Sequence, residues 1–200
     1  SIAPEGLTRA LYENSGSEAI DTALKLVWYF WNANGKPEKK KVIAREKAYH
    51  GSTIASASLT GLPRMHADFD LPIARIVRAP CPHYWKGAKD GETEEAFAAR
   101  MVMETEAIIL KEGADTVGAT FAEPLQGAGG VIPPPRGYFT GIEALCRKYD
   151  LLLIADEVIC GFGRTGNMWG SETYGLKPDM LTCAKALTAS YIPVSYTHLR

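Results

Sequence analysis

Apolar residues along this chain recur at two different spacings, and the two spacings alternate. Between residues 15 and 31 they return every three or four positions, and Ser15 with Glu18 has the capping-box pattern of a helix start. The segments 93–111 and 138–149 have the same helical spacing. The pattern therefore predicts three long helices.

Short apolar segments between these helices predict strands. They lie at residues 41–45, 73–77, 116–123, 151–155 and 180–184. The segment at 151–155, LLLIA, is apolar throughout, which is typical of a strand buried on both faces. Strands that alternate with helices predict an α/β fold, in which helices cover both faces of a mostly parallel central sheet.

Composition and charge narrow the possible partners. Hydrophobic residues make up 46% of the 200 residues and charged residues 22%, which suits one domain with a real core. The net charge of −1 gives no basic surface, so neither nucleic acid nor a membrane is expected as a partner. The four cysteines lie far apart without a CxxC pair, which favours reduced thiols in a cytoplasmic protein over disulfides or a metal site.

A GxGxxG motif at residues 161–166 raises the alternative of a dinucleotide site. Such a site needs a helix that begins at the glycines and receives the pyrophosphate. The following residues, NMWGS, have no helical spacing, and no acidic residue follows at the required distance. An ATPase interpretation of LLLIADE fails too, because the chain has no GxxxxGK[ST] loop. We therefore predict that Asp156, before the glycines, carries the chemistry.

Four polar or aromatic side chains follow the predicted strands. They are Tyr49, Glu123, Asp156 and Lys185. Because ligands bind at the carboxyl ends of parallel strands, we expect these residues to share one crevice. The helix start at residues 15–17, Ser-Gly-Ser, would offer backbone N–H groups to an anion.

This set of groups suits pyridoxal 5′-phosphate (PLP). The cofactor needs a lysine amine for its aldehyde, an acid for its pyridine nitrogen, a flat face for its ring and a helix N-terminus for its phosphate. Lys185 would also move a proton between substrate and cofactor carbons, a step worth roughly 10²–10⁴-fold in rate. Each residue alone has an ordinary structural explanation, such as a turn cap for Asp156. Their joint placement favours the cofactor site.

Five motifs carry a family resemblance. They are NSGSEA (14–19), AYHGST (48–53), AEPLQGAGGVIPPP (122–135), LLLIADEVICGFGRTG (151–166) and KPDMLTCAKALT (177–188). Together they resemble class III, fold-type-I aminotransferases that use PLP, over about residues 5–194. The sequence after residue 156 looks closest to that of the omega-amino acid or amine–pyruvate branch.

The resemblance implies a role for each matching residue. Lys185 is the Schiff-base lysine and Asp156 is the partner of the pyridine nitrogen, while Gly16 and Ser17 hold the phosphate.

Other positions implied by the resemblance surround the ring. Val158 packs on the ring face opposite Tyr49, Glu123 lies near the phenolic oxygen, and Ala128 lines the amine pocket. Ile159 stands where some branches have a glutamine, which argues against the ornithine-type branch.

The resemblance also implies that residues 1–194 are part of a PLP-binding large domain. Family members are homodimers about twice this length, so we expect an N-terminal segment and a C-terminal small domain to be missing. The end of the chain does not continue the family pattern, in which another apolar strand follows. We therefore expect residues 195–200 to be a non-native tail.

The resulting hypothesis is an aminotransferase that moves an amino group from a primary amine or omega-amino acid to a keto acid such as pyruvate. Three alternatives stay open: another PLP enzyme of this fold (an aminomutase, racemase or decarboxylase), a catalytically inactive fragment, and a nicotinamide oxidoreductase.

Overall fold

A seven-stranded sheet forms the centre of the molecule in a computed structural model, which describes residues 2–189, 191 and 195–199. The strands are β1 (Arg9–Glu13), β2 (Lys41–Arg45), β3 (Ile76–Ala79), β4 (Val117–Ala122), β5 (Leu152–Asp156), β6 (Met180–Cys183) and β7 (Ser195–Leu199). Their order is β1-β7-β6-β5-β4-β2-β3. Strands β6, β5, β4, β2 and β3 pair in parallel, whereas β7 runs antiparallel to both β6 and β1. The predicted mostly parallel sheet is confirmed.

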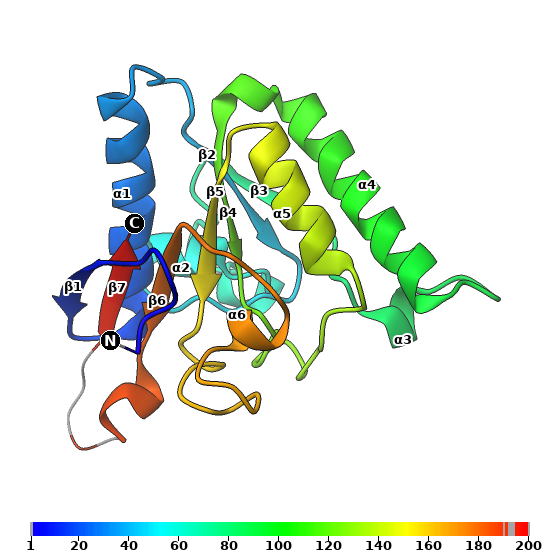
Figure 1. Cartoon of the computed structure of the whole chain (residues 1–200). Helices are drawn as coiled ribbons and strands as arrows, with labels where there is room; N and C mark the ends of the chain where they lie inside the picture. Colours follow the sequence, from blue (N-terminus) through cyan, green and yellow to red (C-terminus); the bar gives the residue numbers. More distant parts are fainter. Residues whose placement is uncertain (1, 190, 192–194, 200) are drawn as a thin grey trace.

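Helices lie on both faces of this sheet. They are α1 (Gly16–Ala33), α2 (Ile54–Leu59), α3 (Tyr84–Gly87), α4 (Glu94–Glu112), α5 (Tyr138–Lys148) and α6 (Gly170–Thr173). In Figure 1, α1 covers one face while α4 and α5 lie side by side on the other. The three long helices agree with the three predicted from apolar spacing.

Alternate residues of the central strands supply two separate cores. Val42 and Ile154 pack with the buried face of α1, whereas Ile43 and Leu153 pack with the residues of α4 and α5. Successive side chains of a strand point to opposite faces. A strand covered on both faces must therefore be apolar at every position, which explains the uninterrupted LLLIA segment.

Helix α1 begins as its sequence predicts. The Ser15 Oγ accepts a hydrogen bond from the Glu18 N–H at 3.1 Å. The Glu18 carboxylate reaches back one residue further than in a standard capping box, to the Asn14 N–H at 2.8 Å. At the other end of the helix, the buried Trp31 indole donates to the Gly118 carbonyl at 2.9 Å, which fixes α1 to β4.

Two parts of the strand prediction were wrong. The strand expected at 73–77 begins only at Ile76, because Arg75 has a left-handed φ of 78° that interrupts extended backbone. Strand β1 was missed because four of its five residues are exposed, so no buried face produces an alternating pattern. Residues 195–199, where the sequence lacks the expected apolar strand, nevertheless form β7 between β6 and β1. Their non-native origin stays a prediction.

Candidate functional site

The four predicted residues lie at one edge of the sheet. Asp156 is the last residue of β5, Glu123 follows β4 directly, and Lys185 comes just after β6. Tyr49 lies in the turn that follows β2. Because these four strands are parallel neighbours, their carboxyl ends meet at the same edge, as the sequence predicts.

Asp156 is a buried carboxylate with a histidine partner. Its Oδ2 lies 2.7 Å from the His50 Nδ1, and its Oδ1 accepts from the Val158 N–H at 3.1 Å and the Thr182 hydroxyl at 3.4 Å. Asp156 is 3% exposed and His50 is 3% exposed. An ionised carboxylate can only accept, so the His50 Nδ1 carries the proton of this bond. The arrangement fixes the orientation of the Asp156 carboxylate.

Sequence reasoning did not assign a role to His50. The residue stood in the AYHGST motif beside Tyr49, and that adjacency was the available signal. Its backbone N–H is held by the Thr60 hydroxyl at 2.9 Å, and its ring meets Phe121 edge to face with centroids 6.3 Å apart. Among the described residues, its Nε2 has no hydrogen-bond partner. The His50 ring therefore hydrogen-bonds to the Asp156 carboxylate through its Nδ1.

Glu123 uses both carboxylate oxygens on backbone groups. Its Oε1 accepts from the Tyr49 N–H at 3.0 Å, and its Oε2 accepts from the Gly127 N–H at 2.9 Å. Burial raises the pKa of Glu123, and the nearby His50 opposes that rise. The buried Arg45 guanidinium donates to the Glu123 carbonyl. Glu123 therefore fixes Tyr49 and the turn at Gly127 to the end of β4.

The start of α1 approaches the same strand ends closely. A Cβ at Gly16 would lie 3.1 Å from both Cγ atoms of Val158 and 3.5 Å from the Ala184 Cβ. The Ser17 hydroxyl accepts from the Ser52 N–H at 3.0 Å. Within the described part of the chain, the backbone N–H groups of Gly16 and Ser17 make no hydrogen bond. This helix N-terminus therefore presents free donors beside the ends of β5 and β6, where an anion can bind.

Lys185 is exposed and has an unusual backbone conformation. Its φ is 48°, in the left-handed region that favours glycine, and it begins a short 3-10 helix. For a non-glycine residue this conformation costs about 1–3 kcal/mol, and such residues concentrate at functional sites. The residue before it, Ala184, lies next to Gly16. The lysine thus follows directly on the close contact between β6 and α1.

The turn that contains Ala128 lies against the segment after β5. Ala128 is exposed, and a Cβ at its neighbour Gly127 would meet the Ile159 Cδ1 at 2.7 Å. A β-bridge between Gln126 and Ile132 closes this turn. Gly127 therefore brings this turn into contact with Ile159. The role of Ala128 toward a substrate stays a prediction.

The glycine motif does not open a long helix. Residues 158–169 form turns, and α6 has only four residues. The loop is held by its own contacts, including the bond from the Phe162 N–H to the Met168 carbonyl at 2.6 Å and the edge-to-face pair of Phe162 and Trp169. This geometry contradicts a dinucleotide site at these glycines, because no helix N-terminus follows them.

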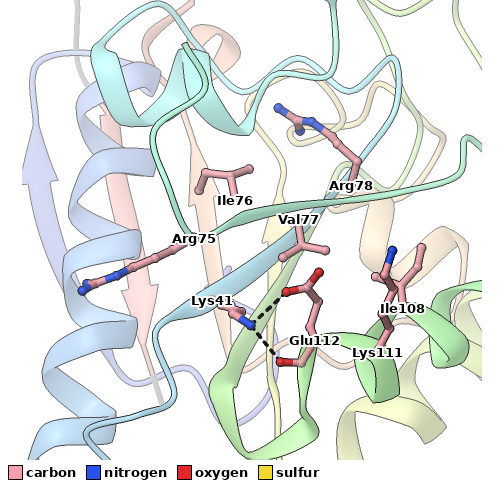
Figure 2. Close-up of a pocket in the computed structure, with 8 residues that line it drawn as sticks. All are labelled: Lys41, Arg75, Ile76, Val77, Arg78, Ile108, Lys111 and Glu112. Atoms are coloured by element: carbon pink, nitrogen blue, oxygen red, sulfur yellow. Dashed lines mark hydrogen bonds and ion pairs between the residues drawn. The ribbon is translucent and has the colours of Figure 1, made fainter. Parts of the chain in front are cut away.

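A charged pocket of about 360 Å³ lies away from this site, beside β3 and the end of α4 (Figure 2). Four cations line it, and two of them, Lys41 and Arg78, make close contacts with carboxylate or carbonyl oxygens. Lys41 binds both the carboxylate and the carbonyl of Glu112, each at 2.8 Å. Arg78 donates to the carbonyls of Ser58, Leu59 and Thr60, and burial lowers its pKa to about 10. These contacts give Lys41 and Arg78 structural roles.

Comparison with known proteins extends over the whole chain. The family model for class-III aminotransferases matches residues 1–200. The chain is 58% identical over 188 residues to gamma aminobutyrate transaminase 1, mitochondrial, of Solanum lycopersicum. The aligned region covers 94% of this chain and 36% of that protein. The chain is 54% identical over 189 residues to vanillin aminotransferase of Capsicum chinense, with 94% and 41% covered.

Solved structures of transaminases have the same fold as this chain. The omega transaminase from Pseudomonas jessenii in complex with PMP superimposes with a TM-score of 0.98 at 53% identity, over 100% of this chain and 44% of that one. A transaminase with L-ala superimposes with a TM-score of 0.97 at 53% identity, over 99% and 46%. The chain thus spans less than half the length of these relatives. Among its described residues, no helix has the length and apolar character needed to cross a membrane.

Proposed function

Because the chain belongs to the class-III aminotransferase family, we propose that its protein moves an amino group from a primary amine or an omega-amino acid to a keto acid, with PLP as cofactor. The observation that carries the proposal is the buried Asp156 carboxylate, held by His50 at the tip of β5. The neighbouring strand β6 leads directly to Lys185. An acid for the pyridine nitrogen and an amine for the aldehyde therefore lie on adjacent strand ends.

The residues at this edge fit PLP in two further respects. The unpaired N–H groups of Gly16 and Ser17 suit a phosphate at the start of α1. A Cβ at position 16 would lie only 3.1 Å from the Val158 side chain, which would have to move slightly, and glycine avoids this. Tyr49 lies at the same edge, with its backbone held by Glu123. We assign Tyr49 and Val158 to the two faces of the ring.

The chemistry divides between the cofactor and the chain. When bound, PLP supplies an aldehyde for the amino group and a ring that accepts electrons from the substrate carbon. We assign the Lys185 Nζ to holding that aldehyde and to moving the proton at the reacting carbon. The Asp156 carboxylate, oriented by His50, would keep the pyridine nitrogen protonated.

The amine substrate is proposed from the names of the relatives and from Ala128. One relative is named for gamma-aminobutyrate, an omega-amino acid donor, and the other for vanillin, an aldehyde that becomes a primary amine when it accepts an amino group. Ala128 would give the amine pocket a small side chain. Stoichiometric formation of alanine from pyruvate and an amine donor would distinguish transamination from aminomutase, racemase or decarboxylase activity.

Three broader expectations also remain proposals. Residues 1–194 would be part of a PLP-binding large domain, to which family members add an N-terminal segment and a small domain. The family resemblance implies a homodimer. Light scattering of the complete protein tests the dimer. A cytoplasmic location is tested by cell fractionation, because several relatives carry mitochondrial or chloroplastic names.

Replacing Lys185 tests the function directly. In the complete protein, Lys185→Ala removes the amine that holds the cofactor, so both the visible absorbance of bound PLP and the transamination rate are expected to disappear. The matched control is Lys177→Ala, at an exposed lysine on the loop before β6. Absorbance and turnover that survive in Lys185→Ala would refute the assignment.

A further inference from the structure

Glu157 is a second buried carboxylate beside Asp156, and the proposed chemistry does not use it. It has no exposed surface. Its Oε2 accepts from the Gly170 N–H at 2.9 Å and its Oε1 accepts from the Ser171 N–H at 2.6 Å. Both oxygens therefore bind the first residues of α6, thirteen and fourteen positions further along the chain.

The contact between Glu157 and Gly170 leaves little room. A Cβ at Gly170 would lie 3.1 Å from the Glu157 Oε2, 2.7 Å from the Cys160 Cβ and 2.9 Å from the Pro124 Cβ. The backbone at position 170 is thus enclosed between the segments that follow β5 and β4. Glycine fits there because a side chain would come too close to the Cβ atoms of Cys160 and Pro124.

The backbone of Glu157 is held as firmly as its side chain. Its N–H donates to the Thr182 carbonyl of β6 at 2.8 Å, and its carbonyl accepts from the Gly161 N–H at 2.9 Å. The peptide units on either side belong to Asp156 and Val158, and the Val158 N–H is itself a donor to the Asp156 carboxylate. A shift of Glu157 therefore moves a group that orients Asp156.

Both donors to the Glu157 carboxylate are backbone N–H groups. An ionised carboxylate accepts from both, whereas a neutral amide at this place would direct its NH₂ against one of the N–H donors. Burial raises the pKa of Glu157, and the bonds from Ser171 and Gly170 oppose that rise. The charged form is the one whose oxygens match the donors present.

We propose that Glu157 is a positioning residue for the reaction: by fastening the loop 157–171 at its base, it fixes the 156–158 backbone that orients the Asp156 carboxylate. The inference rests on the proposed function. It gives Glu157, the acid next to Asp156, a positioning role. The loop that contains the GxGxxG motif is the segment whose two ends the Glu157 carboxylate holds together.

The test compares two glutamate variants of the complete protein. Glu157→Gln keeps the shape of the side chain but loses one of the two acceptor bonds. Glu172→Gln is the matched control, because Glu172 also accepts a backbone N–H of this loop, from Trp169 at 3.2 Å, but is exposed and does not touch the 156–158 backbone. The measurements are PLP absorbance, kcat and KM for the amine, and amide hydrogen exchange.

Glu157→Gln is expected to bind PLP, to lower kcat by roughly tenfold to a hundredfold, and to leave KM for the amine within about threefold, as expected for a misplaced catalytic group. Exchange at the Val158 amide should accelerate together with exchange at Gly170. Glu172→Gln should change none of these quantities.

Two results would overturn the positioning role. One is an unchanged kcat in Glu157→Gln, and the other is an equal loss in Glu172→Gln, which would indicate loop stability alone. If Glu157→Gln fails to fold, Glu157→Asp keeps the charge with a shorter reach and must show the same selective loss of kcat. Absence of PLP binding or transamination in the unmodified protein would instead refute the proposed function.

Discussion

The hydrogen bond between His50 and Asp156 gives the sharpest prediction about the site. In His50→Phe, an aromatic ring still packs near Phe121, but the Nδ1 donor 2.7 Å from the Asp156 Oδ2 is lost. Asp156 would keep only the Val158 N–H and the longer bond from Thr182. The variant therefore tests the donor with little change in packing.

The expected magnitude follows from the burial of the pair. A hydrogen bond to a charged group is worth about 1.5–3 kcal/mol. Since roughly 1.4 kcal/mol corresponds to a factor of ten, His50→Phe should lower kcat/KM about 10- to 100-fold. His50→Asn, whose side-chain amide offers a donor near the same place, should recover part of this loss.

The assay measures kcat/KM for an amine donor with pyruvate and the dissociation constant of PLP for both variants. His66→Phe is a suitable control, because His66 is a partly buried histidine whose Nε2 lies 2.8 Å from the Ala57 carbonyl, outside the proposed site. If His50→Phe stays within about twofold of the unmodified protein, the donor has no role. Equal losses in His50→Phe and His50→Asn would show that a donor near this place does not restore activity, and would contradict the role of the donor.

Two predictions concern stability. The buried Lys39 Nζ donates to the carbonyls of Val117, Tyr149 and Asp150, each at 3.0 Å, so Lys39→Met should lower the free energy of unfolding in urea by about 3 kcal/mol. The exposed Lys36→Met should change it by less than about 1 kcal/mol, and equal effects would contradict this. The Arg100 hydrogen bonds hold the pKa of Glu92 at about 2, so their stabilisation is present above the ordinary value near 4.5 and is lost as pH falls from there toward about 2. Glu92→Gln should flatten the fall of the urea midpoint over that range, and an unchanged slope would refute it.

Local patterns in the sequence were sufficient for the long helices and the central strands. Buried positions recur with the period of the element, so the apolar spacing of α1 and the LLLIA segment of β5 reflect how each element is buried. Strand β1 is mostly exposed and has no such apolar pattern, so it could not be predicted in this way. Short helices such as α2 and α6 contain too few residues to show a period.

The sequence by itself also determined which residues stand at strand ends, because parallel strands place their carboxyl ends together. The order of residues along the chain therefore places Asp156 and Lys185 at one edge of the sheet. Tertiary structure alone decided the partners of these groups. His50 lies 106 positions from Asp156, and Glu123 lies 74 positions from the Tyr49 backbone that it holds. A hydrogen bond needs atoms within about 3 Å, and only the folded chain sets such distances between remote segments.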